Sequence, residues 1–236
     1  MLTLILVLLI LLVLAEGWTL LLRCRRGHPG WKLLRQYRYA HRGYHDKPHI
    51  PENSMAAFHR AIENGFGAEL DVHLLKDGHL AVIHDASLKR TAGADVLVED
   101  LTSEELKAYR LEGTDERIPL LDEVLALFEG KTPLVVELKP ERGNHAELAA
   151  ATCALLDRYR VDYCIESFDP RVVGIIRHQA PGVLRGQLSD SYRSYRHDGT
   201  HPVPAYVLSH CFGNFLGRPD FIAWCPDKRN WAVRLA

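Results

Sequence analysis

The sequence lacks the features that mark disulfide-rich, zinc-binding and nucleic-acid-binding proteins. Its five cysteines are odd in number and include no C-x-x-C pair. A disulfide framework and a cysteine zinc cluster are therefore disfavoured, and a reducing compartment fits the chain better. The net charge of −1 leaves no basic footprint, so we expect no nucleic-acid partner. The cysteines are Cys24, Cys153, Cys164, Cys211 and Cys225.

What remains is the composition of an ordinary globular protein. Hydrophobic residues make up 47% of the 236 residues and charged residues 25%. That length is enough for one large hydrophobic core. The sequence shows no internal repeat and no low-complexity tract, so we expect one folded domain, formed by residues 37–236.

Residues 1–22 form an apolar run in which Glu16 is the only charged residue. About 20 apolar residues suffice to cross a bilayer as a helix, so the run predicts one transmembrane helix. Glu16 and Trp18 lie near its end, where a carboxylate reaches the interface and tryptophan is favoured. The alternative is a cleaved signal peptide. No Lys or Arg precedes the apolar core, however, and Ala15, the best cleavage point, is followed by more apolar chain.

Basic residues crowd the C-terminal side of this run, and none precedes it. Arg23, Arg25 and Arg26 follow at once, within a basic juxtamembrane linker of residues 23–36. The segment Gly27-His28-Pro29-Gly30 ends the helix. The positive-inside rule then leaves the N-terminus outside and the rest of the chain in the cytoplasm. We therefore expect a single-pass membrane protein with a cytoplasmic domain.

Strand-like and helix-like patterns alternate after the linker, which favours a parallel α/β fold. Residues 134–139 are mostly apolar on both faces, as a buried parallel strand should be. Residues 190–219 lack periodicity and are expected to form a loop with one or two short helices. The predicted strands are 37–41, 68–75, 80–84, 134–139, 163–168, 183–188 and 221–225, and the predicted helices follow residues 54, 102 and 121 and cover 146–159 and 172–178.

Seven strands with helices between most of them predict a TIM-type (β/α)₈ barrel that lacks its eighth strand. Such barrels usually need about 250 residues, with about 200 as a lower bound. Residues 37–236 reach only that bound, and the chain stops within a helix-like segment at Ala236. We therefore expect a truncated reading frame. In a barrel, the C-terminal ends of the strands would form the mouth of the active site.

Acidic residues lie two apart in one predicted strand. Glu69 and Asp71 therefore point to the same face, and Glu137 and Lys139 repeat this arrangement in a later strand. Burying these charges is costly unless they pair with each other or hold a metal. Because Mg²⁺ and Ca²⁺ prefer carboxylate oxygens, the three acids are candidate ligands of one divalent cation. Lys139 could instead simply neutralise Glu137.

His41 and His84 each end a short predicted strand, so they are expected at the same mouth as the acids. Arg42 and Lys139 could hold a phosphate anion there, and two flanking histidines could then act as general base and general acid. Asp85 is expected to orient a loop. Isolated histidines are more often structural than catalytic, so no function is assigned to His45, His49, His59, His73 and His79.

Eight motifs in order resemble those of the glycerophosphodiester phosphodiesterase family. Each is a weak signal alone, but together they are specific and cover about residues 39–168. Beyond that range only the general pattern agrees. The motifs are His41-Arg42-Gly43, Pro51-Glu52-Asn53-Ser54, Glu69-x-Asp71, Lys76-Asp77-Gly78, His84-Asp85, Ile118-Pro119-x-Leu121, Glu137-x-Lys139 and Ser167-Phe168.

The resemblance implies a TIM barrel, a divalent cation, and hydrolysis of glycerophosphodiesters to glycerol 3-phosphate and an alcohol. Ser54 departs from the family's usual threonine but keeps the hydroxyl that can cap a helix. The family's closing strand, with its Trp-Thr pair, is absent, which concerns folding more than chemistry. The implied metal ligands are Glu69, Asp71 and Glu137, the implied acid/base pair is His41 and His84, and the implied phosphate contacts are Arg42 and Lys139, with Glu52 and Asn53 at the rim.

Two other functions stay open at this point. The predicted membrane anchor makes lipid substrates plausible, so a related barrel could cleave the headgroup of a lysophospholipid or sphingolipid. A membrane-tethered binding protein without catalysis is the other alternative. The complete set of three acids and two histidines argues against the binding protein, whereas the missing strand argues for it.

Overall fold

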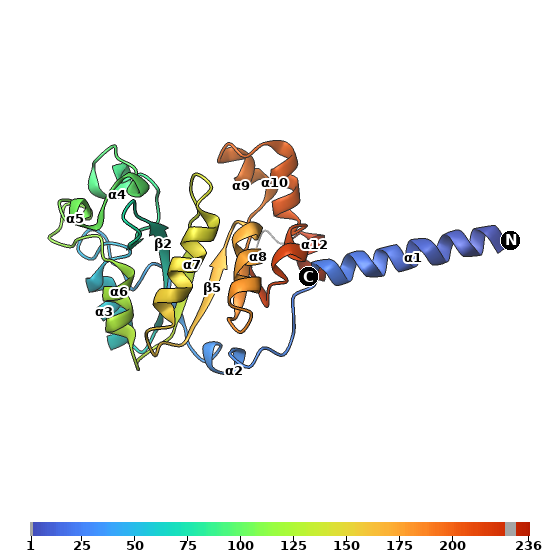
Figure 1. Ribbon diagram of the computed structural model, residues 1–236, viewed down its shortest axis with the longest axis horizontal. Helices are drawn as coiled ribbons and strands as arrows, with labels where there is room; N and C mark the ends of the chain where they lie inside the picture. The colour runs from blue at the N-terminus through green and yellow to red at the C-terminus, as the bar shows by residue number, and fades with distance from the viewer. Residues whose placement is uncertain (1, 225–229) are drawn as a thin grey trace.

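The computed structural model describes residues 2–224 and 230–236. One long helix, α1 (Leu2–Leu22), projects from a domain built around a single curled sheet (Figure 1). The strands are β1 (Tyr39–Ala40), β2 (Gly67–Leu74), β3 (Leu80–Val82), β4 (Leu134–Leu138), β5 (Tyr163–Ser167), β6 (Arg185–Leu188) and β7 (Phe221–Ala223). The other helices are α2 (Trp31–Leu34), α3 (Met55–Glu63), α4 (Lys89–Ala92), η1 (Val98–Asp100), α5 (Ser103–Leu106), α6 (Leu121–Phe128), α7 (His145–Leu156), α8 (Pro170–Gln179), α9 (Tyr192–His197), α10 (Pro202–Ser209), α11 (Asn214–Gly217) and α12 (Trp231–Leu235).

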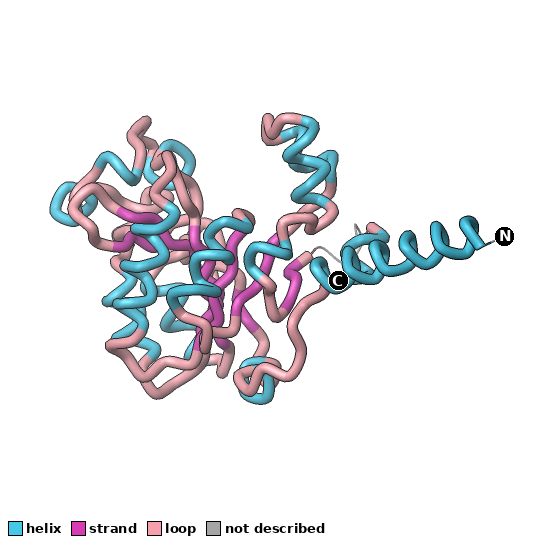
Figure 2. Tube along the Cα trace, turned by 45° about the vertical axis from the view of Figure 1, so that its right-hand side comes forward, coloured by secondary structure: helices cyan, strands magenta, loops and turns pink. Residues whose placement is uncertain are grey.

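Six of the strands are parallel and follow the order β1-β2-β4-β5-β6-β7. Among the described residues β1 and β7 form the two ends of this order, so the sheet is an open, curled half-barrel (Figure 2). The predicted α/β fold with parallel strands is therefore confirmed. The described part of the chain holds two parallel strands fewer than a (β/α)₈ barrel, not one fewer as the sequence predicted.

The third predicted strand accounts for the difference. β3 forms, but it pairs antiparallel with β2, with Val72 opposite Val82. The connection from Leu74 to Leu80 contains the turn Lys76-Asp77-Gly78, where the Gly78 amide donates to the Leu75 carbonyl. A parallel pair needs a crossover of a dozen or more residues, so this short turn allows only a hairpin. His84 consequently follows a hairpin strand and not a barrel strand.

The core lies where the apolar faces of the helices meet the sheet. β2 is buried along nearly its whole length, and β4 is buried except at Val135. In α3, Phe58 and Ala61 face this core, and Ser54 caps the helix by accepting a hydrogen bond from the Ala57 amide at 3.2 Å. The predicted capping role of Ser54 is thus confirmed.

Two predicted loop regions contain more structure than their sequences suggested. The predicted linker includes α2, whose Trp31 packs edge-to-face on Phe221. The region 190–219 holds three short helices, α9, α10 and α11, where one or two were predicted. Among the described residues, Cys24, Cys153, Cys164 and Cys211 are free thiols. Cys225, the last residue of the seventh predicted strand, lies outside the described residues.

α1 has the length and composition of a membrane span. Its window Thr3–Leu20 has a mean hydropathy of 2.4, and none of it is buried inside the structure. A signal sequence near an N-terminus passes the same test, so the helix by itself does not separate the two interpretations.

Candidate active site

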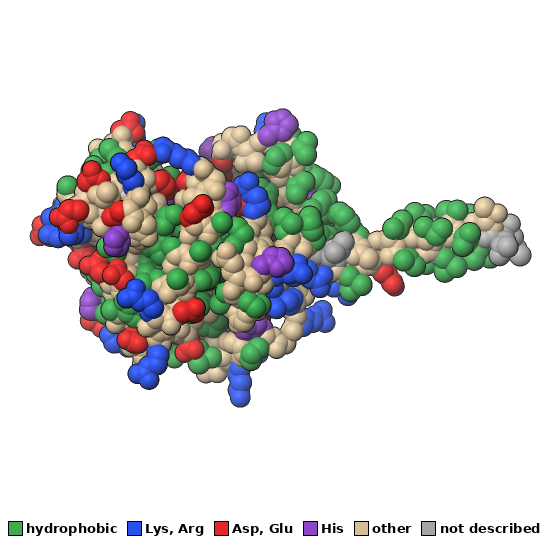
Figure 3. All heavy atoms as spheres, viewed as in Figure 1, with side chains coloured by type: hydrophobic (Ala, Val, Ile, Leu, Met, Phe, Trp, Pro, Cys, Tyr) green, Lys and Arg blue, Asp and Glu red, His purple; other side chains and the backbone are tan. Residues whose placement is uncertain are grey.

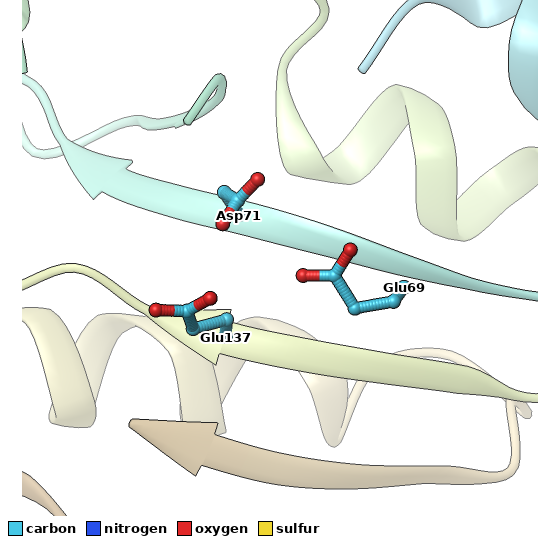
Figure 4. Close-up of side chains that lie close together, drawn as sticks. All are labelled: Glu69, Asp71 and Glu137. Carbon is cyan, nitrogen blue, oxygen red and sulfur yellow. The ribbon is translucent and has the colours of Figure 1, made fainter. Parts of the chain in front are cut away.

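Three carboxylates from two neighbouring parallel strands converge on one point (Figure 4). Glu69 and Asp71 lie on β2, and the strand register places Asp71 directly beside Glu137 of β4. One oxygen of each residue lies within 4.8 Å of those of the other two, and all three residues are buried. The predicted convergence of these acids on one point is therefore confirmed.

Lys139 sits against this acidic trio, with Nζ 2.6 Å from Glu137 Oε1 and 3.0 Å from Asp71 Oδ1. Burial raises the pKa of Glu69 and of Glu137, and repulsion from Asp71 adds to both shifts. Burial acts in the same direction on Asp71, but the charge of Lys139 outweighs it and holds the pKa of Asp71 below its ordinary value. The single ammonium of Lys139 therefore does not offset the charge of three ionised carboxylates.

Two separate turns, joined by a 2.8 Å hydrogen bond from the Asn53 amide to the Arg42 carbonyl, bring Arg42 and Asn53 onto the trio. Both residues have positive φ angles, 55° and 52°, a conformation that costs about 1–3 kcal/mol for residues other than glycine. The Arg42 amide donates to Glu69 Oε2 at 2.8 Å, and Asn53 Nδ2 donates to Asp71 Oδ2 at 2.8 Å. The two turns therefore orient two of the three carboxylates.

Glu52 and Asn53 are not at the rim of the site, where the sequence placed them. Glu52 is 5% exposed and Asn53 1% exposed. Glu52 lies among three cations: Arg42 at 2.9 Å, Arg90 at 2.6 Å and Lys47 at 3.1 Å. A carboxylate surrounded by hydrogen-bonding cations can stay ionised when buried, so Glu52 can serve as an internal anchor for Arg42.

The two predicted histidines face the same site from different segments. His41 is largely exposed, and its Nε2 lies 3.9 Å from Glu69 Oε2. His84 Nδ1 lies 2.6 Å from Asp85 Oδ1, which favours the tautomer with a proton on Nδ1. Burial lowers the pKa of both, with further lowering by Arg42 at His41 and by Lys139 at His84. Both imidazoles therefore lose their proton more readily than a free histidine side chain does.

His73 holds the His84 segment in place, although no function was assigned to it from the sequence. Its ring is 1% exposed, with Nδ1 2.6 Å from Glu99 Oε1 and Nε2 3.2 Å from the His84 carbonyl. His73 therefore links β2 to the backbone of a candidate catalytic residue. Its place two residues after Asp71, on the same face of β2, was a usable signal.

Glu166 is a fourth buried acid that sequence reasoning missed. The register aligns it with Glu137 across β4 and β5, and it is 7% exposed. Burial, followed by repulsion from Glu137, raises the pKa of Glu166 to about 8. It lies outside the convergent trio. Its position at the C-terminal end of a parallel strand was the available signal.

A cavity of about 730 Å³ opens beside these residues. His84, Glu137 and Lys139 line one part of it, and the rest of the wall is largely apolar. Phe168 contributes to this wall and lies 5.9 Å from Lys139 Nζ, measured to the ring centroid. A polar corner with an adjoining apolar chamber can accept a molecule with a charged and a non-polar part. The other apolar side chains of the wall are Ala86, Leu138, Pro140, Pro170, Tyr195, Val203, Pro204, Val207 and Leu208.

Comparisons with known sequences place the chain in a family. Residues 41–219 match the model of the glycerophosphoryl diester phosphodiesterase family. A glycerophosphodiester phosphodiesterase of Caldanaerobacter subterraneus subsp. tengcongensis is 47% identical over 204 residues, which cover 81% of this chain and 80% of that protein. Lysophospholipase D GDPD1 of Rattus norvegicus is 38% identical over 125 residues, 48% of this chain but only 38% of that protein.

Solved structures show the same fold. A phosphodiesterase of Oleispira antarctica, in complex with the product sn-glycerol-3-phosphate, superposes with a TM-score of 0.60 at 27% identity and covers 70% of this chain and 72% of its own. A glycerophosphodiester phosphodiesterase from Parabacteroides distasonis superposes with a TM-score of 0.59 at 22% identity, covering 80% of this chain and 92% of its own. The second likeness concerns the fold alone.

Proposed function

The chain belongs to the glycerophosphoryl diester phosphodiesterase family, and on that premise we propose that it hydrolyses glycerophosphodiesters to glycerol 3-phosphate and an alcohol. The observation that carries the proposal is the buried trio of Glu69, Asp71 and Glu137, with a histidine on each of two neighbouring segments. A relative that binds sn-glycerol-3-phosphate as product supports the choice of substrate class.

The trio has the chemistry of a site for one divalent cation. Three carboxylates with oxygens within 4.8 Å of one another, offset mainly by Lys139, match the hard oxygen ligands that Mg²⁺ and Ca²⁺ prefer. Glu69, Asp71 and Glu137 would hold the ion. When bound there, a divalent cation supplies Lewis-acid polarisation of a phosphoryl oxygen and offsets the charge of the phosphodiester.

Arg42 and Lys139 supply the remaining positive charge around the phosphate. One guanidinium nitrogen of Arg42 lies 2.9 Å from Glu52, and its Nε lies 3.6 Å from Asp71. The remaining N–H groups of the guanidinium can donate to a phosphate oxygen. Lys139 shares two carboxylates with the proposed cation. If the cation bound the oxygens of Asp71 and Glu137, the Lys139 ammonium would be free to pair with the phosphate.

His41 and His84 serve as the general base and the general acid. In-line displacement requires a proton acceptor on the attacking side of the phosphate and a proton donor on the leaving side. The contact with Asp85 fixes the His84 ring and leaves its Nε2 to exchange a proton with the substrate or the nucleophile. The nucleophile is water or the neighbouring glycerol hydroxyl.

A lysophospholipid is the second candidate substrate, and the apolar part of the cavity favours it. The chamber lies next to His84 and Lys139, so a headgroup phosphate at the trio would leave the glycerol-linked chain near Phe168. The match to a protein named lysophospholipase D points the same way over part of the chain.

An assay with two choline esters tests the proposal. We expect the full chain in detergent, with Mg²⁺ or Ca²⁺, to release choline from glycerophosphocholine, with glycerol 3-phosphate as the other product. Choline released from lysophosphatidylcholine at a higher kcat/KM would favour the second candidate. A chain that binds glycerophosphocholine without turnover in either metal would be a binding protein, and the proposed hydrolysis would be wrong.

We also propose that α1 anchors the domain to the cytoplasmic face of a membrane. The proposal depends on the exposed apolar window Thr3–Leu20 and on the arginines that follow it. Protease added outside intact cells should leave the domain undigested, and detergent should make it sensitive. Digestion without detergent would show the opposite orientation, and a chain shortened by removal of α1 would show a signal peptide.

A further inference from the structure

Large apolar side chains gather on the part of the domain that surrounds the base of α1 (Figure 3). Trp231 is 52% exposed, and Tyr206 and Phe215 are each 48% exposed. Exposed aromatic residues grouped in this way mark an interaction surface more often than a free one. We call this group the apolar collar; it consists of Trp18, Tyr206, Phe212, Phe215, Trp231 and Leu235.

The base of α1 is fixed to the domain, so the collar has a defined position relative to the helix. Asn214 Nδ2 donates to the Leu22 carbonyl at 2.9 Å, and an Arg218 guanidinium nitrogen donates to the Leu20 carbonyl at 2.7 Å. The Cys24 amide donates to the carbonyl of Ala236 at 3.0 Å, which ties the end of α12 to the same point. A helix held in this way cannot act as a loose tether.

Ring contacts place the collar at the same level along α1 as Trp18. Phe212 packs edge-to-face on Trp18 with ring centroids 5.3 Å apart, and Trp231 lies 6.3 Å from Phe212. Trp18 belongs to the apolar window of α1, near its C-terminal end. A side chain in contact with Trp18 must therefore lie at the level at which α1 leaves the bilayer, where tryptophan and tyrosine are favoured.

The charges beside the collar suit a lipid surface. Arg23 and Arg26 are exposed directly after α1, and Arg218 lies against its last turn. Basic side chains gather next to the base of the helix in Figure 3. Arginines near an anionic leaflet are attracted by its negative surface potential. The surface thus combines interfacial aromatics with cations, as membrane-facing surfaces do.

We propose that the apolar collar seats the domain directly on the bilayer that α1 crosses, with Trp231 in the headgroup layer. This inference goes beyond the proposed hydrolysis and rests on the proposed membrane span. A bilayer is favoured over a second copy of the chain because any cover for the collar must also reach Trp18, which lies on the spanning helix itself. The collar continues the apolar surface of α1 onto the domain.

Fluorescence quenching by brominated lipids tests the proposal with single conservative substitutions. The sequence contains four tryptophans, Trp18, Trp31, Trp224 and Trp231. The full chain is placed in phosphatidylcholine–phosphatidylserine vesicles whose acyl chains carry bromine close to the headgroup. We expect Trp231→Phe and Trp18→Phe each to lower the quenchable fraction of the emission. Trp31 lies on α2, away from the collar, so the lipid bromines should not quench its fluorescence. Trp31→Phe removes this unquenched emission and should therefore raise the quenchable fraction.

The control variants separate failure of the collar from failure of the span. If Trp18→Phe lowers the quenchable fraction and Trp231→Phe does not, the domain does not contact the bilayer and the inference is wrong. That result would still agree with α1 as a membrane span. If neither variant changes the quenchable fraction, α1 does not cross the bilayer, and the inference is wrong as well. Because Trp231 is half exposed, its replacement by Phe should leave the circular dichroism and thermal melt unchanged.

Discussion

Replacing either His41 or His84 by alanine is expected to lower kcat by roughly 10²–10⁴-fold, the usual contribution of one acid/base group. Each imidazole reaches the site from its own segment of the chain, so neither can take over both proton transfers. Steady-state kinetics on glycerophosphocholine with the full chain in detergent measures the effect.

The controls separate a chemical role from a structural one. His59 is exposed on α3, away from the trio, so His59→Ala should keep wild-type kcat. The concentration of Mg²⁺ or Ca²⁺ needed for half-maximal activity should stay close to the wild-type value in both active-site variants, because neither histidine belongs to the convergent trio. Wild-type turnover by His41→Ala or His84→Ala would contradict the two-histidine mechanism.

The trio could be predicted from sequence because it depends on the simplest geometric rule of a strand. Residues two apart share a face, so Glu69 and Asp71 had to point the same way. Parallel neighbours in an α/β sheet end at the same edge, which brought Glu137 beside Asp71. Both rules are local or topological, and neither depends on side-chain packing.

The hairpin strand β3 was the main error in the fold. Its apolar run reads like a barrel strand, and only the five-residue connection from Leu75 to His79 distinguishes the two. The sequence placed His84 at the active site because it was expected to end a barrel strand, whereas in the structure it follows a hairpin strand. The structure holds its segment through His73, whose ring reaches the His84 carbonyl. A contact between a side chain and a distant backbone leaves no periodic pattern in the sequence.

Burial is the other feature that the sequence could not supply. Glu52 was expected at the rim, yet three cations from separate segments enclose it, and those segments meet only in the folded chain. Glu166 has no charged neighbour in sequence that would single it out. Its raised pKa arises from burial beside Glu137, which belongs to another strand.

Adding Mg²⁺ or Ca²⁺ at about 100 times its dissociation constant is expected to stabilise the folded chain by about 2.7 kcal/mol, and chelation should reverse the gain. For a domain of this size the gain corresponds to a rise in Tm of roughly 5–10 °C. The reason is that the acidic trio holds more like charge than Lys139 can offset, and a divalent cation relieves it. Activity should disappear and return with the same treatment.

Two buried acids at one level of the sheet make this test specific. Glu137→Gln removes a ligand of the trio, so it should abolish most of the cation-induced rise in Tm and most of the activity. Its Tm in chelator should equal or exceed that of the wild type, because burial disfavours an ionised carboxylate at this position and Asp71 repels it, and together these effects outweigh the attraction of Lys139. Glu166→Gln makes the same chemical change one strand away, outside the trio, and should keep the rise. Should Glu137→Gln keep the rise, or should Glu166→Gln alone lose it, the cation would have to bind elsewhere than at Glu69, Asp71 and Glu137.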